Sequence, residues 1–360
     1  MRLRHLVARG FRNLADGRHE LPPRGLALLG ANAQGKSNFL EAVYYPVVFR
    51  SFRGAQDQAV AAFGGPGFHL EAAVERADAA DAVVTATWQA AGRRKRIAVD
   101  EVESERVSGA VGHWLAVVFL PADLGLASGP APERRHYLDR LLSLADSTYL
   151  RALSRYRAAL AQRNAALRQA RPELAWAFDR PLAEAGAAVV AARCAWAGPA
   201  AERFAAEFEC LGEGERASLS YRGTAELADA DAWEPALWEA RDADRSRGMT
   251  TVGPHRDDLI LRIGGRLLRE YGSTGQLRSA AVALKLLEIE TLRETRGTEP
   301  GLLLDDVFAE LDRDRQRRLA VRLLGGAERQ VFLTAPRPDE LPPGLELEVR
   351  RMAGGRVSRA

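Results

Sequence analysis

A phosphate-binding loop is the first feature of this sequence that could carry chemistry. Residues 30–37 complete the pattern G-x-x-x-x-G-K-[ST]; they follow the apolar run "GLALLG" and open a helical pattern. In such a loop, successive backbone N–H groups and the positive end of the helix hold phosphates. Lys36 is expected to reach the β- and γ-phosphates, and the Ser37 hydroxyl is expected to ligate Mg²⁺. The residues of this candidate nucleotide site are Gly30, Ala31, Asn32, Ala33, Gln34, Gly35, Lys36 and Ser37.

Ala33 is unusual within this loop, because many loops of this kind carry another glycine there. A residue other than glycine tolerates a positive φ poorly, at a cost of about 1 kcal/mol. The positions that the pattern requires are intact, so we expect a competent loop with slight strain at Ala33. The alternative is a glycine turn that arose by chance.

Two adjacent carboxylates supply the second half of a nucleotide site. In "PGLLLDDVFAELD" (300–312), the apolar run predicts a buried strand that ends at Asp305 and Asp306. Asp305 is expected to hold the Mg²⁺ shell, and Asp306 to orient or activate a water molecule against the γ-phosphate. Carboxylates also occur at strand ends as simple caps. The phosphate loop in the same chain favours the catalytic interpretation, a Walker B motif.

A third motif begins a long amphipathic helix predicted over residues 273–295. Ser273, Gly275 and Gln276 form the pattern S-x-G-Q, and the helix N-terminus here makes a second anion-binding surface. An ordinary N-cap serine with a turn glycine also explains this pattern. The order phosphate loop, insertion, S-x-G-Q and Walker B is, however, the layout of ABC-type ATPase heads. In those heads the signature helix of one subunit closes on the nucleotide held by the other.

Length and composition suit a soluble chain with two lobes. At 360 residues the chain is long for one domain, which favours two lobes or one domain with a large insertion. Basic residues number 51 and acidic residues 48, so the net charge of +3 permits a polyanionic partner without requiring one. Only Lys36, Lys95 and Lys285 are lysines, and we attribute this arginine bias to a GC-rich genome rather than to a nucleic-acid surface.

Cys194 and Cys210 form no C-x-x-C, which argues against a zinc site or a disulfide framework. The absence of a long apolar run predicts no membrane segment and a cytoplasmic location.

The pattern of elements predicts an α/β head that a helical insertion interrupts. Residues 68–119 contain alternating segments typical of antiparallel strands, and "LPADLGLASGPAPERR" (120–135) is expected to be a loop. Apolar residues then recur at helical spacing over residues 149–167, close to the period of coiled coils, and a further helix is expected over 313–324. We expect three parts: the N-terminal part of the head with the phosphate loop and a β-rich lobe (1–125), a helical insertion domain (126–245), and the C-terminal part of the head with the signature and Walker B motifs (246–360).

These motifs, in this order, resemble the RecF family of bacterial recombination mediators, ATPases related to the SMC and Rad50 heads. The resemblance spans nearly the whole chain. It rests on "GFRNL" (10–14), "GANAQGKSNFLEAV" (30–43), "FRSFR" (49–53), "VFLPADLGLASGPAPERRHYLD" (118–139), "YRAALAQRNAALR" (156–168), "TVGPHRDDL" (251–259), "YGSTGQLRSAAVALKL" (271–286) and "LLLDDVFAELD" (302–312). The chain departs from the family pattern at Ala33, at Leu277 in place of a second glutamine, and at "LTAPRP" (333–338) in place of a threonine-rich strand end. These departures concern the rate of turnover more than binding.

The resemblance implies an SMC- or Rad50-like ABC ATPase head with a β-rich lobe and a short, coiled-coil-like helical insertion. ATP and Mg²⁺ would bind between two subunits, so that ATP drives homodimerisation and a weak DNA-dependent ATPase activity reverses it. Asp306 then stands where ABC ATPases carry a catalytic glutamate, and "AELD" (309–312) is the dimer-contacting D-loop. Arg12 and Asn13 are expected beside the phosphates or the base.

The same resemblance implies the biological role. The implied partners are DNA (single-stranded, gapped, or at a duplex junction) and the RecR and RecO proteins. The implied function is to help load the recombinase RecA during DNA repair, replication restart and the SOS response.

Two groups of basic residues have two interpretations each. The first, on a predicted hairpin, is Arg93, Arg94, Lys95 and Arg96. The second, off the apolar seam of the helical arm, is Arg151, Arg155, Arg163 and Arg168. Both groups are either solvated surface charges or contacts for DNA phosphates. Residues 253–258 similarly either shape the signature lobe or an interface, or form a Gly-Pro turn with aspartate caps.

Three other classes of protein share parts of this pattern. The ATPase subunit of a membrane transporter has the same motif order, but the long insertion, the β-rich lobe and the missing switch histidine argue against it. A monomeric small-molecule kinase or hydrolase would have no use for Ser273 of a second copy. A cohesin-like or Rad50-like head would carry an arm of hundreds of residues, far longer than this insertion.

Overall fold

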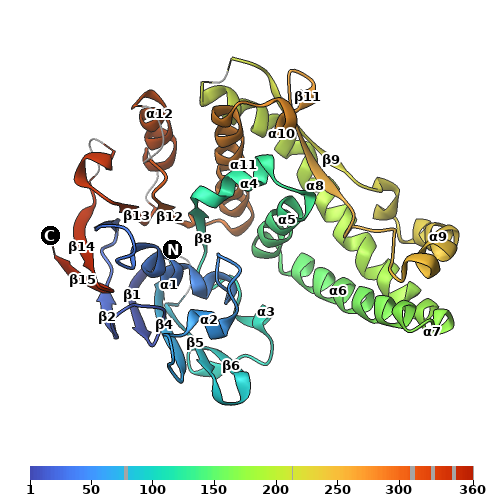
Figure 1. The fold of residues 1–360 in the computed structure, drawn as a ribbon, viewed down its shortest axis with the longest axis horizontal. Helices are drawn as coiled ribbons and strands as arrows, with labels where there is room; N and C mark the ends of the chain where they lie inside the picture. The colour runs from blue at the N-terminus through green and yellow to red at the C-terminus, as the bar shows by residue number, and fades with distance from the viewer. Residues whose placement is uncertain (77–79, 213, 309–312, 326–328, 343–345, 360) are drawn as a thin grey trace. The chain divides into compact units, whose positions relative to one another are not determined.

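The computed structural model divides the chain into two compact units (Figure 1). It describes residues 1–360 except 77–79, 213, 309–312, 326–328, 343–345 and 360. The first unit contains Met1–Ala122 and Leu292–Ala360, and the second contains Asp123–Thr291. The two ends of the chain therefore build one unit together. The second unit extends beyond residue 245, the expected end of the insertion, and includes the S-x-G-Q motif.

A six-stranded, mostly parallel sheet forms the centre of the first unit. Its order is β15-β14-β3-β13-β12-β8, in which only β15 is antiparallel to its neighbour. The strands are β3 (Gly25–Leu29), β8 (Ala116–Phe119), β12 (Gly301–Asp305), β13 (Val331–Ala335), β14 (Glu348–Ala353) and β15 (Arg356–Arg359). The helices connected to them are α1 (Lys36–Val48) and α12 (Arg313–Leu324), with η5 (Pro338–Glu340) after β13. Because β13 lies between β3 and β12, the ends of three strands far apart in sequence meet at one edge.

The expectation of an antiparallel strand near residue 119 was wrong. Strand β8 belongs to the parallel sheet, where Val117 pairs with Leu302 of β12. All four residues of β8 are buried. A continuous apolar run of this kind is typical of an interior parallel strand, whereas a strand with one face in solvent alternates.

A six-stranded antiparallel sheet forms the β-rich lobe of the first unit, in the order β2-β1-β4-β5-β6-β7. Alternating burial along β5 leaves one face in contact with the core and the other toward solvent. Phe11, Tyr45 and Phe68 pack edge to face, with ring centroids 5.3–6.0 Å apart. The strands are β1 (Arg2–Arg9), β2 (Gly17–Glu20), β4 (Gly67–Glu75), β5 (Ala82–Gln89), β6 (Arg94–Val99) and β7 (Val102–Glu103). The short helices of this lobe are α2 (Asp57–Val60), η1 (Ala91–Arg93) and α3 (Val107–Ala110).

Helices dominate the second unit, in which α6 and α8 lie side by side (Figure 1). The helices are α4 (Leu124–Ser128), α5 (Ala131–Ala145), α6 (Ser147–Arg168), α7 (Pro172–Trp176), α8 (Asp179–Cys210), α9 (Trp233–Arg247), α10 (Leu268–Tyr271) and α11 (Thr274–Arg296). Short 3₁₀ turns are η2 (Pro121–Asp123), η3 (Ala225–Ala228) and η4 (Ala230–Ala232). A three-stranded sheet contains β9 (Ala217–Arg222), β10 (Asp258–Ile263) and β11 (Arg266–Leu267). Among the described residues, no helix has the length and apolar character needed to cross a membrane.

The segment 120–135 was expected to be a loop and is largely helical instead. It contains η2, α4 and the first turn of α5. Pro132 lies in that first turn, where a proline is tolerated because the first N–H groups of a helix have no intrahelical partner. Prolines and glycines in this stretch mark helix starts and ends, so they do not interrupt helical structure.

Buried ion pairs hold the second unit together. Arg163, one of the arginines expected on a solvated or DNA-binding face, is fully buried. Its guanidinium donates to Asp179 at 2.8 Å and to Asp244 at 2.6 Å. The expectation for Arg163 was therefore wrong, because a buried guanidinium is retained only where carboxylates and hydrogen bonds compensate for its desolvation. Arg151, Arg155 and Arg168 are exposed.

Residues 253–258 join this buried network. Asp258 accepts two hydrogen bonds from Arg134, at 2.8 and 3.0 Å, and Asp257 accepts one from the Tyr221 hydroxyl. Gly253 has a φ of 123°, and a Cβ there would lie 2.6 Å from the Tyr156 hydroxyl. This segment therefore shapes the second unit through a glycine-specific turn and paired aspartates.

Candidate nucleotide-binding site

The phosphate loop leaves β3 at Leu29 and enters α1 at Lys36. Gly35 has a φ of 109°, and a Cβ there would lie 2.9 Å from the Asn13 side-chain oxygen. At Gly30 a Cβ would lie 2.3 Å from the carbonyl oxygen of Met352. Ala33 has a φ of 66°, in the left-handed region, which gives the expected strain at this position a structural basis.

The Lys36 ammonium group lies inside the loop that it belongs to. Its Nζ donates to the carbonyl oxygen of Gly30 at 2.7 Å and to that of Ala31 at 3.3 Å. The side chain is 5% exposed. Backbone carbonyls therefore hold the Lys36 charge at the centre of the loop. Charged phosphate oxygens would bind the ammonium more strongly than these neutral carbonyls do.

Ser37, Asp305 and Thr334 form one hydrogen-bonded cluster. The Ser37 hydroxyl donates to Oδ1 of Asp305 at 2.8 Å, and the Thr334 hydroxyl donates to the same oxygen at 2.8 Å. Asp305 and Thr334 are adjacent partners on β12 and β13. Carboxylate and hydroxyl oxygens are the ligands that Mg²⁺ prefers, so Ser37 and Asp305 fit its donor set. Among the described residues, no three His, Cys, Asp or Glu side chains converge on a metal site. Phosphate and water oxygens would therefore have to complete the shell.

Asp306 occupies a different environment from its neighbour. It has a φ of 49°, and its backbone N–H donates to the Thr334 hydroxyl oxygen at 3.0 Å. Burial raises the pKa of the Asp306 carboxyl above its usual value; the charge of Lys36 opposes this shift, and the charge of Asp305 adds to it. A carboxyl with a raised pKa is a better proton acceptor than an exposed aspartate, as activation of a water molecule requires.

Gln34 connects the loop to the β14–β15 hairpin. Its side-chain oxygen accepts from the Gly354 N–H at 2.8 Å, and its backbone carbonyl accepts from the Gly355 N–H at 2.9 Å. Both oxygens of Gln34 are therefore engaged by the hairpin, and the groups that can donate to a phosphate are its backbone N–H and its side-chain NH₂ group. The hairpin supports the loop from the C-terminal end of the chain.

Arg12 and Asn13 each contact α1, Arg12 through Glu41 and Asn13 through Asn38. The Arg12 guanidinium makes a two-pronged ion pair with Glu41, at 2.8 and 3.0 Å, and donates to the Ala59 carbonyl at 2.6 Å. Glu41 is fully buried and also accepts from the Ser51 hydroxyl. Asn13 accepts from the Asn38 side chain at 2.8 Å.

The sequence reasoning missed Glu41, Ser51 and Thr334. A signal existed for Glu41, which is a carboxylate among the apolar residues of α1 that face the core. A signal also existed for Thr334, a hydroxyl at the end of a fully buried strand. Both are polar side chains where burial is costly without a partner.

The S-x-G-Q motif lies in the second unit and caps α11. The Ser273 N–H donates to the Gln276 side-chain oxygen at 2.9 Å, and the Gln276 N–H donates to the Ser273 hydroxyl at 3.2 Å. This reciprocal arrangement is a capping box, which satisfies helix N–H groups that lack partners. Ser273 is exposed, and Gly275 and Gln276 are partly exposed. The expected D-loop, residues 309–312, lies outside the described residues.

The basic hairpin keeps three of its four charges on the surface. Arg93, Arg94 and Arg96 belong to or follow the turn between β5 and β6 and are exposed. Lys95 turns inward, where its ammonium pairs with Asp57 at 3.1 Å and lies 4.9 Å from the centre of the Tyr45 ring. The expectation that Lys95 shares the hairpin's surface charge was therefore wrong, because an aromatic face and a carboxylate attract it to the lobe.

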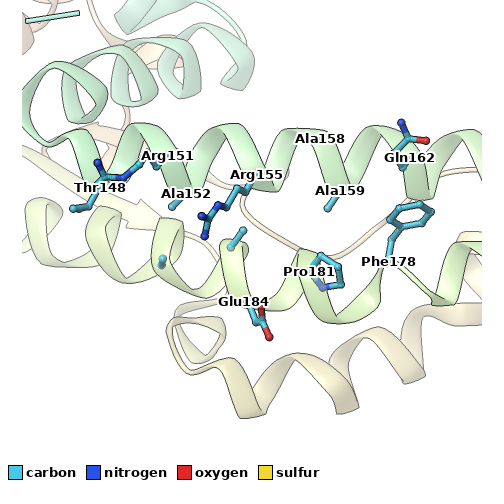
Figure 2. Close-up of a pocket in the computed structure, with 12 residues that line it drawn as sticks. Thr148, Arg151, Ala152, Arg155, Ala158, Ala159, Gln162, Phe178, Pro181 and Glu184 are labelled. Atoms are coloured by element: carbon cyan, nitrogen blue, oxygen red, sulfur yellow. The ribbon is translucent and has the colours of Figure 1, made fainter. Parts of the chain in front are cut away.

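A groove of about 530 Å³ lies between α6 and α8 of the second unit (Figure 2). Ala152, Ala159 and Ala185 contribute to its lining, and Figure 2 shows Arg155 directed from α6 into the space between the helices. Of the described residues that line it, none belongs to the phosphate loop or to the acidic strand end. This groove is therefore separate from the candidate nucleotide site.

The phosphate loop follows a parallel strand, and an acidic strand end lies beside it. Together with the helical insertion in the chain, these features define an ABC-type ATPase head of the SMC kind. Comparison with solved structures agrees. The head domain of Smc from Pyrococcus furiosus superposes with a TM-score of 0.57 at 16% identity, over 99% of this chain and 94% of that one. No protein-family model matches the chain.

The particular family follows from closer relatives. The DNA replication and repair protein RecF of Anaeromyxobacter sp. (strain Fw109-5) is 36% identical over 99% of both chains. That of Herpetosiphon aurantiacus is 34% identical over 92% of both. The solved structure of the recombination mediator protein RecF with ATP has a TM-score of 0.90 at 30% identity, over 99% of this chain and 97% of that chain. The chain belongs to the RecF family.

Proposed function

We propose that this protein is an ATP-dependent DNA-binding protein of recombinational repair, in which ATP serves as a dimerisation switch. The observation that carries the proposal is the hydrogen bond between Ser37 and Asp305, because it joins the phosphate loop to the acidic strand end in one site. The likeness to RecF structures solved with ATP supports ATP as the nucleotide.

Each residue of the site has a distinct part. The N–H groups of residues 30–37 and the Lys36 ammonium bind the phosphates, and Lys36 exchanges its carbonyl partners for phosphate oxygens. Ser37 and Asp305 hold Mg²⁺, which supplies charge neutralisation at the phosphates. Thr334 fixes the orientation of Asp305. Asp306 accepts a hydrogen bond from the attacking water and takes its proton. Aspartate is one methylene shorter than the glutamate of other ABC ATPases, and this difference supports slow hydrolysis; its dependence on DNA is proposed from the family alone.

The site is completed by a second copy of the chain. The capping box exposes Ser273 at the positive end of α11, which suits a terminal phosphate presented by a partner subunit. ATP thereby favours the closed homodimer, and hydrolysis releases it. Arg12 and Asn13 contact the phosphates or base; Glu41 positions Arg12, and Asn38 positions Asn13.

The cellular role that we propose rests on the family. Solved relatives are described as recombination mediators of the RecFOR pathway. We infer that this chain works in the cytoplasm with the RecO and RecR proteins at single-stranded gaps and their duplex junctions. There it helps to load RecA in repair, replication and the SOS response. Exposed Arg93, Arg94 and Arg96 are candidate contacts for the DNA phosphates.

Light scattering with and without ATP and Mg²⁺, combined with binding to gapped DNA, tests this function. The wild-type protein should dimerise and bind DNA more tightly with ATP. Lys36→Met should remain monomeric, because it lacks the ammonium that holds the phosphates. Asp306→Asn should form longer-lived dimers, because binding is retained and hydrolysis is lost. A wild-type chain that stays monomeric at saturating ATP, or binds DNA equally well without nucleotide, would contradict the switch.

A further inference from the structure

Four arginines of the second unit converge at one end of the helical arm. Arg168 is the last residue of α6, Arg245 and Arg247 lie in the last turn of α9, and Arg256 follows in the 253–258 segment. We call these four residues the arm-end arginines.

Contacts along the Gly248–Met249 turn bring the three segments together. A Cβ placed on Gly248 would lie 3.7 Å from Cγ of Arg168, so the end of α9 touches the end of α6. Arg256 donates to the sulfur of Met249 at 3.5 Å. The Thr250 N–H donates to the Asn164 side-chain oxygen at 2.7 Å, which fixes this turn on α6. The arrangement is thus held by the fold, although residues 168 and 256 are far apart in sequence.

The arm-end arginines have no carboxylate partner among the described residues. All four are exposed, and within the described part of the chain none of them makes an ion pair. Buried Asp244, next to Arg245 in sequence, is already engaged by Arg163 and Thr251, and buried Asp257, next to Arg256, is engaged by Tyr221 and Arg193. Asp242 and Glu173 are exposed nearby in sequence but pair with none of the four.

The helix dipole accounts for only some of the arm-end arginines. Basic residues in the last turn of a helix are stabilised by its dipole, which suits Arg168, Arg245 and Arg247 individually. Arg256 is not on a helix, and bringing like charges together is unfavourable unless an anion lies among them. Guanidinium groups bind phosphate in a forked, two-pronged geometry. Because all four are exposed and come from three segments of the chain, they suit the repeated phosphates of an extended polyanion.

We propose that the arm-end arginines bind the phosphate backbone of DNA, as a second contact surface besides the head. This inference rests on the proposed function, since it assigns part of the DNA contact to the end of the arm. The contact is independent of base sequence and is weakened by salt, because each phosphate contact releases counterions.

The arm also supplies a matched control. Arg151 and Arg155 are on the same helix α6, are exposed, and make no ion pair within the described residues. They line the groove between α6 and α8 (Figure 2). Along α6 both precede Arg168 by more than three helical turns. Replacing both removes the same charge as replacing Arg168 and Arg245.

Salt titration of DNA binding tests the inference. Anisotropy of labelled gapped and single-stranded oligonucleotides is measured with ATP and Mg²⁺ between about 50 and 200 mM salt. Arg168→Gln combined with Arg245→Gln should weaken binding on the order of tenfold at low salt. It should also lower the slope of log K against log salt by about one for each arginine that had bound a phosphate, at most about two. Arg151→Gln combined with Arg155→Gln should keep the wild-type slope. Thermal unfolding and ATP-dependent dimerisation should be unchanged in both variants.

Three outcomes would overturn the inference. An unchanged slope in the Arg168/Arg245 variant, with normal wild-type binding, would overturn it and leave the proposed function standing. An equally weakened control variant would mean that general charge, not this cluster, is responsible. Absence of DNA binding by the wild-type protein would overturn the proposed function, and this inference with it.

Discussion

The Ser37 hydroxyl donates a hydrogen bond to Oδ1 of Asp305 at 2.8 Å, across 268 positions of the sequence. Strand β13 makes this possible, because it pairs with β3 on one side and with β12 on the other. Thr334 at the end of β13 donates to the same carboxylate oxygen. Three parallel strands therefore deliver one polar cluster to the entrance of α1.

Thr334 should control how well the site binds Mg²⁺. Thr334→Val removes the hydroxyl that orients Asp305 and accepts from the Asp306 N–H, so both groups lose a partner. We expect Mg²⁺-dependent ATP binding to weaken by roughly 10- to 100-fold, as for other groups that orient a metal ligand. Titration of a fluorescent ATP analogue at fixed Mg²⁺ concentrations measures this. Thr334→Ser keeps the hydroxyl and should behave as wild type; equal affinity in the valine variant would contradict the role.

Asp306 should make stability depend on pH. Its pKa is raised in the folded protein, chiefly by burial, above the ordinary value of 3.8. Between those two pKa values the folded state binds more protons than the unfolded state. Stability therefore falls as the pH rises through that window, and the loss is complete above the raised pKa. Asp306→Asn should unfold at a higher temperature than wild type at pH 7, and the difference should vanish below the unfolded pKa. Calorimetry from about pH 3.5 to pH 8 measures the unfolding temperature of both proteins. Parallel pH profiles for the two would refute a raised pKa for Asp306.

Glu41 should be essential for the stability of the first unit. Glu41→Gln leaves the Arg12 guanidinium without its buried carboxylate and weakens the acceptor for Ser51. Breaking a buried ion pair from one side costs about 3–5 kcal/mol. Glu20→Gln breaks the exposed pair with Arg18 and should leave the free energy of unfolding nearly unchanged, because solvent screens that pair. Urea unfolding measures the free energy of unfolding of both variants. A similar decrease in the two would show that burial does not make the Glu41 ion pair more important for stability than an exposed one.

Ala33 should be a site where glycine stabilises the protein. Its φ of 66° is unfavourable for alanine by about 1 kcal/mol, and the greater freedom of glycine in the unfolded chain offsets part of the gain. We expect Ala33→Gly to raise the free energy of unfolding by up to about 1 kcal/mol. The same change at exposed Ala161, inside α6, should lower it by about 1 kcal/mol. Thermal unfolding compares the pair, and destabilisation at both positions would mean that the loop imposes no strain.

Local sequence patterns predicted the structure correctly where it depends on residues that are close in the sequence. Helix α12 begins and ends at the predicted residues, and α11 begins one residue after Ser273. Both helices have apolar periodicity and a clear start, and these signals act within a few residues. The phosphate loop was recognisable for the same reason.

Partnerships between distant segments could not be predicted in this way. Nothing local distinguishes Arg163, which is buried on α6, from Arg155, which is exposed on the same helix. The difference comes from Asp179 and Asp244, which α8 and α9 place beside Arg163. Lys95 likewise turns inward because Asp57 and Tyr45 lie there. The missed members of the site, Glu41 and Thr334, also depend on partners far away in sequence.

The position of β3 between β13 and β14 also bears on how the protein is made. A chain leaving the ribosome from its N-terminus exposes the phosphate loop early, but both neighbours of the strand before it are encoded after residue 330. Until β13 and β14 have been translated, β3 has neither of its neighbouring strands, and the hydrogen bond from Ser37 to Asp305 has no sheet to support it. Products that stop before these strands therefore lack the sheet that brings the phosphate loop and the acidic strand end together.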